Sequence, residues 1–200
     1  MAVRALTPFP GPDRTVAASA RHPVPRSALT AALERRGTLC SVGYSHSWMY
    51  DTEHPDWSAG WSQLVDDASR LRDRATDLGI LAEAEISEHH ILVAGTGDDV
   101  CEELVLYRRD APRFNPLRAV PPSAGGEEAL PAFGFVKTAF LPYDALVTAV
   151  LLRASCRLGA AIEVCSDGCW DDWAVGRDLV AATFPSEPAP ARPRRIRTGR

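Results

Sequence analysis

The sequence lacks the features that mark membrane proteins and secreted proteins. No apolar run reaches the roughly 18 residues that a membrane-spanning helix needs. The N-terminal region contains Arg4 but has no apolar segment of the kind found in secretory signal peptides. We therefore expect a cytoplasmic protein that does not associate with a membrane.

Cysteine is scarce, with five residues in a chain of 200. An odd number of cysteines in a chain of this size favours reduced thiols over a disulfide framework. Cys165 and Cys169 have a spacing that occurs in zinc sites, but no second ligand pair at matching spacing accompanies them. We expect no metal and no other cofactor. A nucleophile pair of Cys165 and His46 is one alternative, and a buried structural thiol is the other.

Lysine is the rarest basic residue, because Lys137 is the only one in the chain. The net charge of −4 is unevenly distributed: residues 1–37 carry +4 and residues 192–200 carry +5, which leaves −13 for residues 38–191. An acidic body of this kind argues against nucleic-acid binding. The basic ends are either solvated or in weak contact with phosphates.

Proline is concentrated at the two ends of the chain. Residues 1–38 and 185–200 are rich in proline and arginine, a composition typical of flexible segments. A short helix at residues 27–36 is the one element expected in the leader. We therefore assign residues 1–38 to a flexible leader, residues 39–184 to a single globular domain and residues 185–200 to a flexible tail.

The apolar stretch at residues 133–158 predicts the centre of the fold. Its first residues are aromatic or β-branched and favour a strand, and Pro142 suits the first turn of the helix that follows. Between Ala145 and Leu152 only Thr148 is polar, so this helix is expected to be covered on more than one face.

Patterns elsewhere predict the remaining elements. Apolar residues at spacings of three and four predict a helix at residues 55–78, and residues 110–131, rich in proline, glycine and alanine, predict a long surface loop. Further strands are expected at residues 39–50, 86–93, 101–108 and 161–165, and a last helix at residues 171–184. Together they predict a single α+β domain in which a mixed sheet of about five strands packs against three helices.

One group of candidate ligand-binding residues lies on the first predicted strand. Tyr44, His46 and Trp48 share one parity, so their side chains face the same way. They either line a pocket or belong to the packing surface of the sheet.

A second group lies where predicted strands meet predicted helices. Its members are Lys137, Thr138, Tyr143, Asp144 and Asp167. In open α/β sheets, ligands bind beyond the carboxyl ends of strands, so these residues are candidates for an anion-binding site. The alternative is structural, with Lys137 paired to Asp144, Asp167 or Glu163 to brace the fold.

Three segments resemble a family of small proteins from actinobacteria and their phages. They are Trp57-x3-Trp61-x2-Leu64-Val65-x-Asp67-Ala68, Lys137-Thr138-Ala139-x2-Pro142-Tyr143-Asp144, and Ser166-Asp167-Gly168 with Asp172-Trp173-Ala174. The likeness spans residues 40–184, and the second segment is its most specific part. The family has no established activity, so the resemblance implies a single domain and no particular function.

Two functions stay open. No complete set of catalytic residues can be recognised, so we expect a non-catalytic binding or accessory protein whose partner is a small anionic ligand, another protein or a second copy of the chain. The alternative is a small cytoplasmic enzyme that acts on an anionic metabolite through Lys137, His46 and Asp167. Convergence of these three residues around an open cavity would favour the enzyme, whereas an ion pair that sequesters Lys137 would favour binding.

Overall fold

The computed structural model describes residues 44–109 and 132–199. Within this part of the chain there are seven strands in two sheets and three α-helices. The predicted leader, the start of the predicted domain at residues 39–43 and the predicted loop at residues 110–131 lie outside the described residues.

Helix α3 (Asp144–Arg157) is the central element, as the apolar stretch predicts. Every residue from Asp144 to Ala154 is buried, including the polar Thr148 and the charged Arg153. The helix begins after Tyr143, so Pro142 lies just before the first turn rather than inside it.

Sheet A has the strand order β5-β1-β6-β7. Its strands are β1 (Ser45–Tyr50), β5 (Ala132–Lys137), β6 (Ile162–Cys169) and β7 (Arg195–Arg197). Strand β1 pairs antiparallel with both β5 and β6, which places His46 opposite Val136 on one side and opposite Ser166 on the other. Strand β7 runs parallel to β6.

Sheet B has the order β2-β3-β4, and both of its strand pairs are antiparallel. Its strands are β2 (Glu83–Ile86), β3 (His90–Ala94) and β4 (Leu104–Tyr107). Glu102, just before β4, donates its backbone N–H to the Lys137 carbonyl across 3.1 Å, so the two sheets lie edge to edge. The α+β class and the single domain are confirmed, with seven strands in two sheets in place of about five in one.

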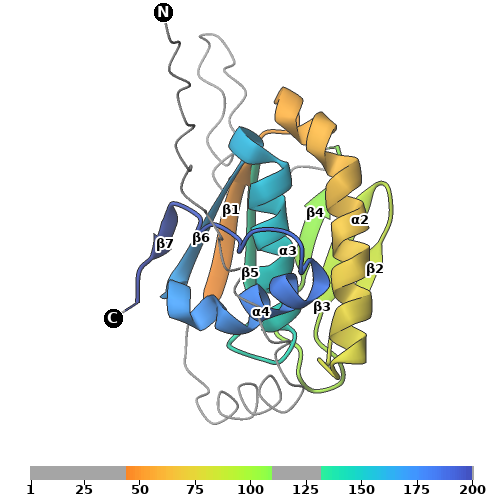
Figure 1. The fold of residues 1–200 in the computed structure, drawn as a ribbon, viewed down its shortest axis with the longest axis vertical. Helices are drawn as coiled ribbons and strands as arrows, with labels where there is room; N and C mark the ends of the chain where they lie inside the picture. Colours follow the sequence, from red (N-terminus) through yellow and green to blue (C-terminus); the bar gives the residue numbers. More distant parts are fainter. Residues whose placement is uncertain (1–43, 110–131, 200) are drawn as a thin grey trace, which may run out of the picture.

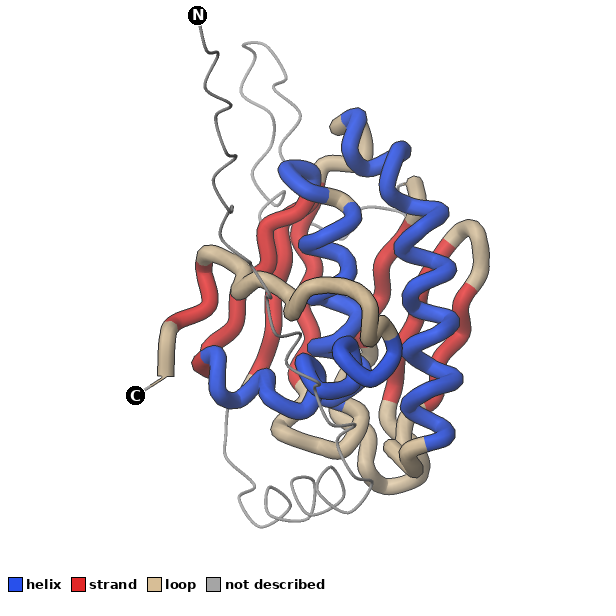
Figure 2. The backbone as a smooth tube through the Cα atoms, in the orientation of Figure 1, coloured by secondary structure: helices blue, strands red, loops and turns tan. Residues whose placement is uncertain are grey.

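The helices cover one side of the sheets (Figure 1, Figure 2). Helices α2 (Pro55–Asp77) and α3 pack on the strands, and α4 (Ala174–Thr183) packs against both helices. The predicted stripe of α2 is buried, with Trp57 and Trp61 at most 2% exposed. Gly60 allows α2 to approach α3 closely, because a Cβ at this position would lie 2.0 Å from the Arg157 carbonyl oxygen. None of the described helices combines the length and apolar character that a membrane span requires.

The domain extends beyond the predicted boundary at residue 184. Strand β7 joins sheet A, its Ile196 is 1% exposed, and Arg195 forms an ion pair with Glu163 of β6 at 2.7 Å. The prediction of a flexible tail was therefore wrong for β7, because one apolar side chain among arginines was enough to add a strand to the edge of the sheet.

Side chains of β1 alternate between two environments. His46 and Trp48 are each 1% exposed and face the helices, whereas Ser45, Ser47 and Met49 face the opposite side. We call that opposite side the open face of sheet A. The strand registers place on it Phe133, Phe135 and Lys137 from β5 and Glu163, Cys165 and Asp167 from β6.

Candidate functional site

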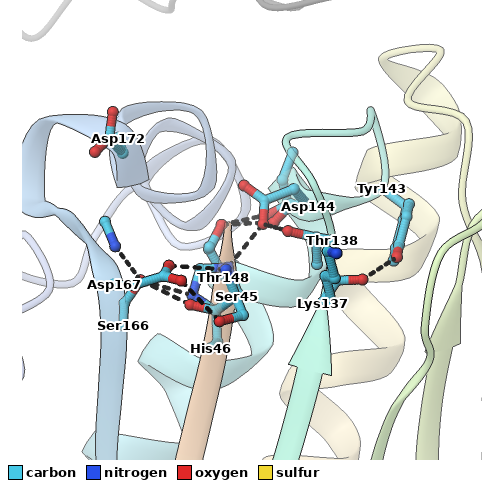
Figure 3. Close-up of polar contacts among 12 residues, drawn as sticks. Ser45, His46, Lys137, Thr138, Tyr143, Asp144, Thr148, Ser166, Asp167 and Asp172 are labelled. Carbon is cyan, nitrogen blue, oxygen red and sulfur yellow. Dashed lines mark hydrogen bonds and ion pairs between the residues drawn. The ribbon is translucent and has the colours of Figure 1, made fainter. Parts of the chain in front are cut away.

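The carboxyl ends of β5 and β6 meet the start of β1 and the first turn of α3 at one edge of sheet A (Figure 3). Four side chains form a hydrogen-bonded row there, which we call the polar cluster: His46, Thr138, Asp144 and Ser166. The structure thus brings three of the predicted candidates into contact, and adds Ser166.

His46 is held at both ring nitrogens inside this cluster. Its Nε2 lies 2.8 Å from Oδ1 of Asp144, and its Nδ1 lies 3.0 Å from Oγ of Ser166. The Thr138 hydroxyl donates to the same Asp144 oxygen across 2.7 Å. Because an ionised carboxylate can only accept hydrogen bonds, Nε2 of His46 carries a hydrogen when Asp144 is ionised.

Ser166 is half-buried, and its hydroxyl forms hydrogen bonds with neighbouring residues of the chain. Its Oγ accepts a hydrogen bond from the Gly168 N–H at 3.1 Å. Its single proton can go to the Ser45 carbonyl at 3.2 Å or to Nδ1 of His46 at 3.0 Å. The first arrangement requires a charged imidazole and the second a neutral one, and the contact between Ser166 and His46 persists in both.

Serine, histidine and aspartate in a row are also the residue types of a hydrolase triad. Such a triad needs an amide donor directed at the developing oxyanion, but the Gly168 N–H is already bonded to Ser166. The rings of Tyr44 and Trp173 pack edge-to-face on His46, with centroids 4.9 Å and 5.0 Å from the imidazole. The cluster joins β1, β6 and α3 through buried and half-buried hydrogen bonds.

Tyr44 also shapes the turn between β5 and α3. Its carbonyl accepts the N–H groups of Thr138 and Ala139 at 3.2 Å and 3.1 Å, and its ring stacks on Phe140 with centroids 3.5 Å apart. Ala139 and Phe140 have φ values of 51° and 61°, in the left-handed region that costs a non-glycine residue roughly 1–2 kcal/mol. These contacts hold the strained turn and place Asp144 beside the sheet.

Tyr143 is another predicted candidate that is fully buried. Its hydroxyl donates to the Glu102 carbonyl at 2.7 Å and accepts the Glu102 N–H at 3.2 Å. Burial is the main reason that the pKa of the phenol rises to about 12. Tyr143 thus joins α3 to the edge of sheet B. Trp48 is likewise buried, so neither side chain is available to a ligand.

Two further candidates lie on the open face, away from His46. Asp167 accepts hydrogen bonds from the N–H and hydroxyl of Ser45 at 2.8 Å and 2.9 Å, and Lys137 follows Phe135 on β5. Cys165 is also on the open face, and burial raises the pKa of its thiol. The convergence of Lys137, His46 and Asp167 that the enzyme alternative requires is not found, and Cys165 does not meet His46, because alternate strand positions point to opposite faces.

The predicted ion pair of Lys137 was also wrong. No described residue pairs with its ammonium, and the expected acids are engaged elsewhere. Asp144 is bonded to His46, and Glu163 is paired with Arg195. The contact that Lys137 does make with an acid is through its backbone N–H, which donates to the Glu102 carboxylate at 2.8 Å.

A network of four charges anchors the segment after α4. Arg153, 3% exposed, donates from Nε to Asp67 at 2.8 Å and from its two terminal nitrogens to Glu187 at 2.7 Å and 3.2 Å. Arg157 donates to the same Asp67 oxygen at 2.7 Å. Burial opposes the charge of Arg153, but the hydrogen bonds that it donates to Glu187 and Asp67 outweigh this effect and raise the pKa of the guanidinium. Hydrogen bonds from Arg153 likewise hold the pKa of Glu187 below its usual range.

From Glu187 the chain crosses over the end of α3 to reach β7, and we call residues 187–194 the strap (dark blue in Figure 1). A cavity of about 730 Å³ lies between the strap, the end of α3 and the start of β6. Its apolar wall includes Leu152, Ile162 and Val164, and the exposed Cys156 lies on its α3 side.

The charges around this strap cavity are not balanced. Both acids that line it, Glu163 and Glu187, are already paired with arginines. Arg192 and Arg194 also line it, and neither has a carboxylate partner among the described residues; Arg192 donates to the Ile196 carbonyl at 2.9 Å. Among the described residues that line the cavity, Arg192 and Arg194 are therefore the cations without a carboxylate partner.

Sequence reasoning missed the strap cavity and the contact of Ser166 with His46. The sequence signal for β7, the strand to which the strap leads, was the single apolar Ile196 between Arg195 and Arg197. This pattern follows the polar-apolar alternation of a strand. The sequence shows that Ser166 and Val164 face the same side of β6. It does not show that Ser166 lies opposite His46, because that depends on the pairing of two strands 120 residues apart.

Comparison with known proteins finds no matching family, no similar curated protein and no similar solved structure. The resemblance drawn from the three sequence segments thus stays a prediction. Among residues 44–109 and 132–199, no three His, Cys, Asp or Glu side chains form a group that could hold a metal ion.

Proposed function

We propose that the protein is a non-catalytic binding protein that holds a small anionic molecule with an apolar body in the strap cavity. The observation that carries this proposal is that one cavity of about 730 Å³ is lined both by apolar side chains and by Arg192 and Arg194. Pockets of about 300–1,000 Å³ with mainly apolar walls and a few charged groups are typical of small-molecule sites.

The chemistry of the lining defines the class of ligand. A planar guanidinium donates two parallel hydrogen bonds to a carboxylate, sulfonate or phosphate group. Leu152, Ile162 and Val164 offer no such donors and favour an apolar body instead. An ion that lacks an apolar part, such as inorganic phosphate, would leave this wall uncovered and bind less well.

An enzymatic function has less support. His46 is 1% exposed and faces the helices, whereas Lys137 and Asp167 lie on the other face of the sheet. A substrate held by Lys137 would be separated from the imidazole by the sheet itself.

The test uses 8-anilinonaphthalene-1-sulfonate, which joins an apolar ring system to one anionic group. We expect its fluorescence to rise on binding to the full chain, and the Arg192→Ala/Arg194→Ala variant to bind it at least tenfold more weakly. The Arg108→Ala/Arg109→Ala variant removes the same charge from the end of β4 and is expected to bind as the unaltered protein does.

A second variant tests the cavity without changing its charge. Cys156 is exposed and lines the cavity, so Cys156→Trp should fill the space while leaving the core in place, and binding should be lost. Unchanged affinity in both the Cys156→Trp protein and the double arginine variant, with folding checked by circular dichroism, would overturn the proposal.

A further inference from the structure

The open face of sheet A is apolar along β5 and at Met49 of β1, and it is not covered by any described helix or strand. Phe135 and Met49 are 48% and 41% exposed, and the register places Phe133 directly opposite Met49. The three α-helices of the described residues lie on the other side of the sheet (Figure 1). Large apolar side chains that gather on one exposed face mark an interaction surface.

Charged residues of opposite sign lie at one end of this face, at the level of Ser45. On one side, at the end of β5, the Lys137 ammonium has no acidic partner among the described residues. On the other side of β1, Asp167 of β6 is exposed and is joined to Ser45, which lies opposite Lys137 in the register. The two charges are therefore at the same level of the sheet, with β1 between them.

This arrangement is complementary to itself. If two open faces meet about a two-fold axis that runs along β1, β5 of each copy lies over β6 of the other. Lys137 of one copy then meets Asp167 of its partner, and the same contact forms a second time by symmetry. Met49 lies near the axis and meets its own counterpart, and Phe135 covers the small side chains at the centre of the partner's face. Sheets that pack face to face keep their strands within about 30° of parallel, which this axis satisfies.

We propose that the protein forms a homodimer through the open face of sheet A, with Lys137 paired to Asp167 of the second copy. The proposal does not rest on the strap cavity, although Glu163 of β6 lies on the open face and also lines that cavity. It assigns a role to Lys137, whose ammonium has no partner among residues 44–109 and 132–199, and to the exposed Phe135 nearby.

Sedimentation equilibrium tests the dimer, which has twice the 21.7 kDa mass of the chain. We expect Phe135→Ser/Met49→Ser and Lys137→Glu each to weaken association at least tenfold, and Lys137→Glu/Asp167→Lys to regain most of it. The matched control is Leu81→Ser/Val100→Ser, which removes two apolar side chains that are 54% and 50% exposed and lie outside sheet A, and it should leave the dimer intact.

The single lysine permits a direct chemical test. A carbodiimide joins an amine to a carboxylate without a spacer, so cross-linked dimers should contain a bond between Lys137 and Asp167, and should disappear in Lys137→Arg, which keeps the charge but removes the reactive amine. A chain that is monomeric at all concentrations would overturn the proposal. A dimer whose association constant is unchanged by Phe135→Ser/Met49→Ser would also overturn it. This second test does not depend on whether a variant that contains Asp167→Lys folds.

Discussion

The imidazole of His46 and the carboxylate of Asp144 share a hydrogen bond of 2.8 Å in the interior, between a strand and a helix that are 98 residues apart in the chain. Both side chains are buried, at 1% and 6% exposure. A carboxylate in the first turn of α3 is also favoured by the helix dipole. The contact therefore fixes the start of the central helix against the central strand of sheet A.

His46→Ala should destabilise the protein by about 3 kcal/mol or more, because a buried carboxylate loses its nitrogen donor and a void replaces the ring. The double variant His46→Ala/Asp144→Asn should cost clearly less than the sum of the two single changes, since they remove the same contact. Urea denaturation measures all three values. Strict additivity, or a loss no larger than that of the exposed His89→Ala, would show that the cluster is not a brace.

Tyr143→Phe should lower stability by roughly 1–2 kcal/mol at neutral pH, since the Glu102 carbonyl loses the hydroxyl that donates to it. The folded pKa of about 12 exceeds the unfolded value of 10.0, so the unfolded state releases its proton first. The contribution of Tyr143 is thus full below pH 10 and falls between pH 10 and 12, by about 1.4 kcal/mol per unit. Between pH 10 and 12 the free energy of unfolding, measured by chemical denaturation, should change less with pH for Tyr143→Phe than for the exposed Tyr107→Phe.

Gly60→Ala should separate α2 from α3, because the added Cβ would lie 2.0 Å from a backbone oxygen that cannot rotate away. Overpacking of this kind costs about 1–3 kcal/mol, even though alanine favours a helix by about 1 kcal/mol over glycine. Ser62→Ala, two residues along on the exposed side of α2, should stay within about 0.5 kcal/mol of the original. Equal melting temperatures for the two variants would contradict the close crossing.

Glu187→Gln should weaken the attachment of the strap to Arg153 and change how the stability of the protein falls at acidic pH. The pKa of Glu187 is held low by Arg153, so its contribution is present at neutral pH and is lost as the pH falls through the folded pKa. Melting temperatures of the two proteins should differ at pH 7 and converge in acid. Glu83→Gln, an exposed change on β2, should show no such convergence.

Local patterns predicted the helices but not the partners of their residues. The spacing of Trp57, Trp61 and Leu64 placed α2 within two residues of its bounds, because an amphipathic helix depends on neighbours three and four positions away. The all-apolar run after Ala145 likewise identified α3 as central.

The candidate site was harder to predict than the helices, because it depends on which strands pair and in what register. Lys137 and His46 were grouped as one site, although the register of β1 and β5 sends them to opposite faces. Tyr44 and Trp48 were placed on one face correctly, but only the packing of helices on that face decides that they are buried. The proline-rich strap was interpreted from composition, and composition does not reveal that Glu187 meets Arg153.

The strap cavity is tested most directly by methyl NMR during a titration with 8-anilinonaphthalene-1-sulfonate, whose ring currents shift nearby methyl signals. We predict shifts for Leu152, Ile162 and Val164, which line the cavity, and none for Ile91 and Leu104 in sheet B. Shifts that are confined to other residues, such as Met49 on the open face, or no shift in the cavity methyl groups at saturating probe, would contradict the assignment of this cavity as the binding site.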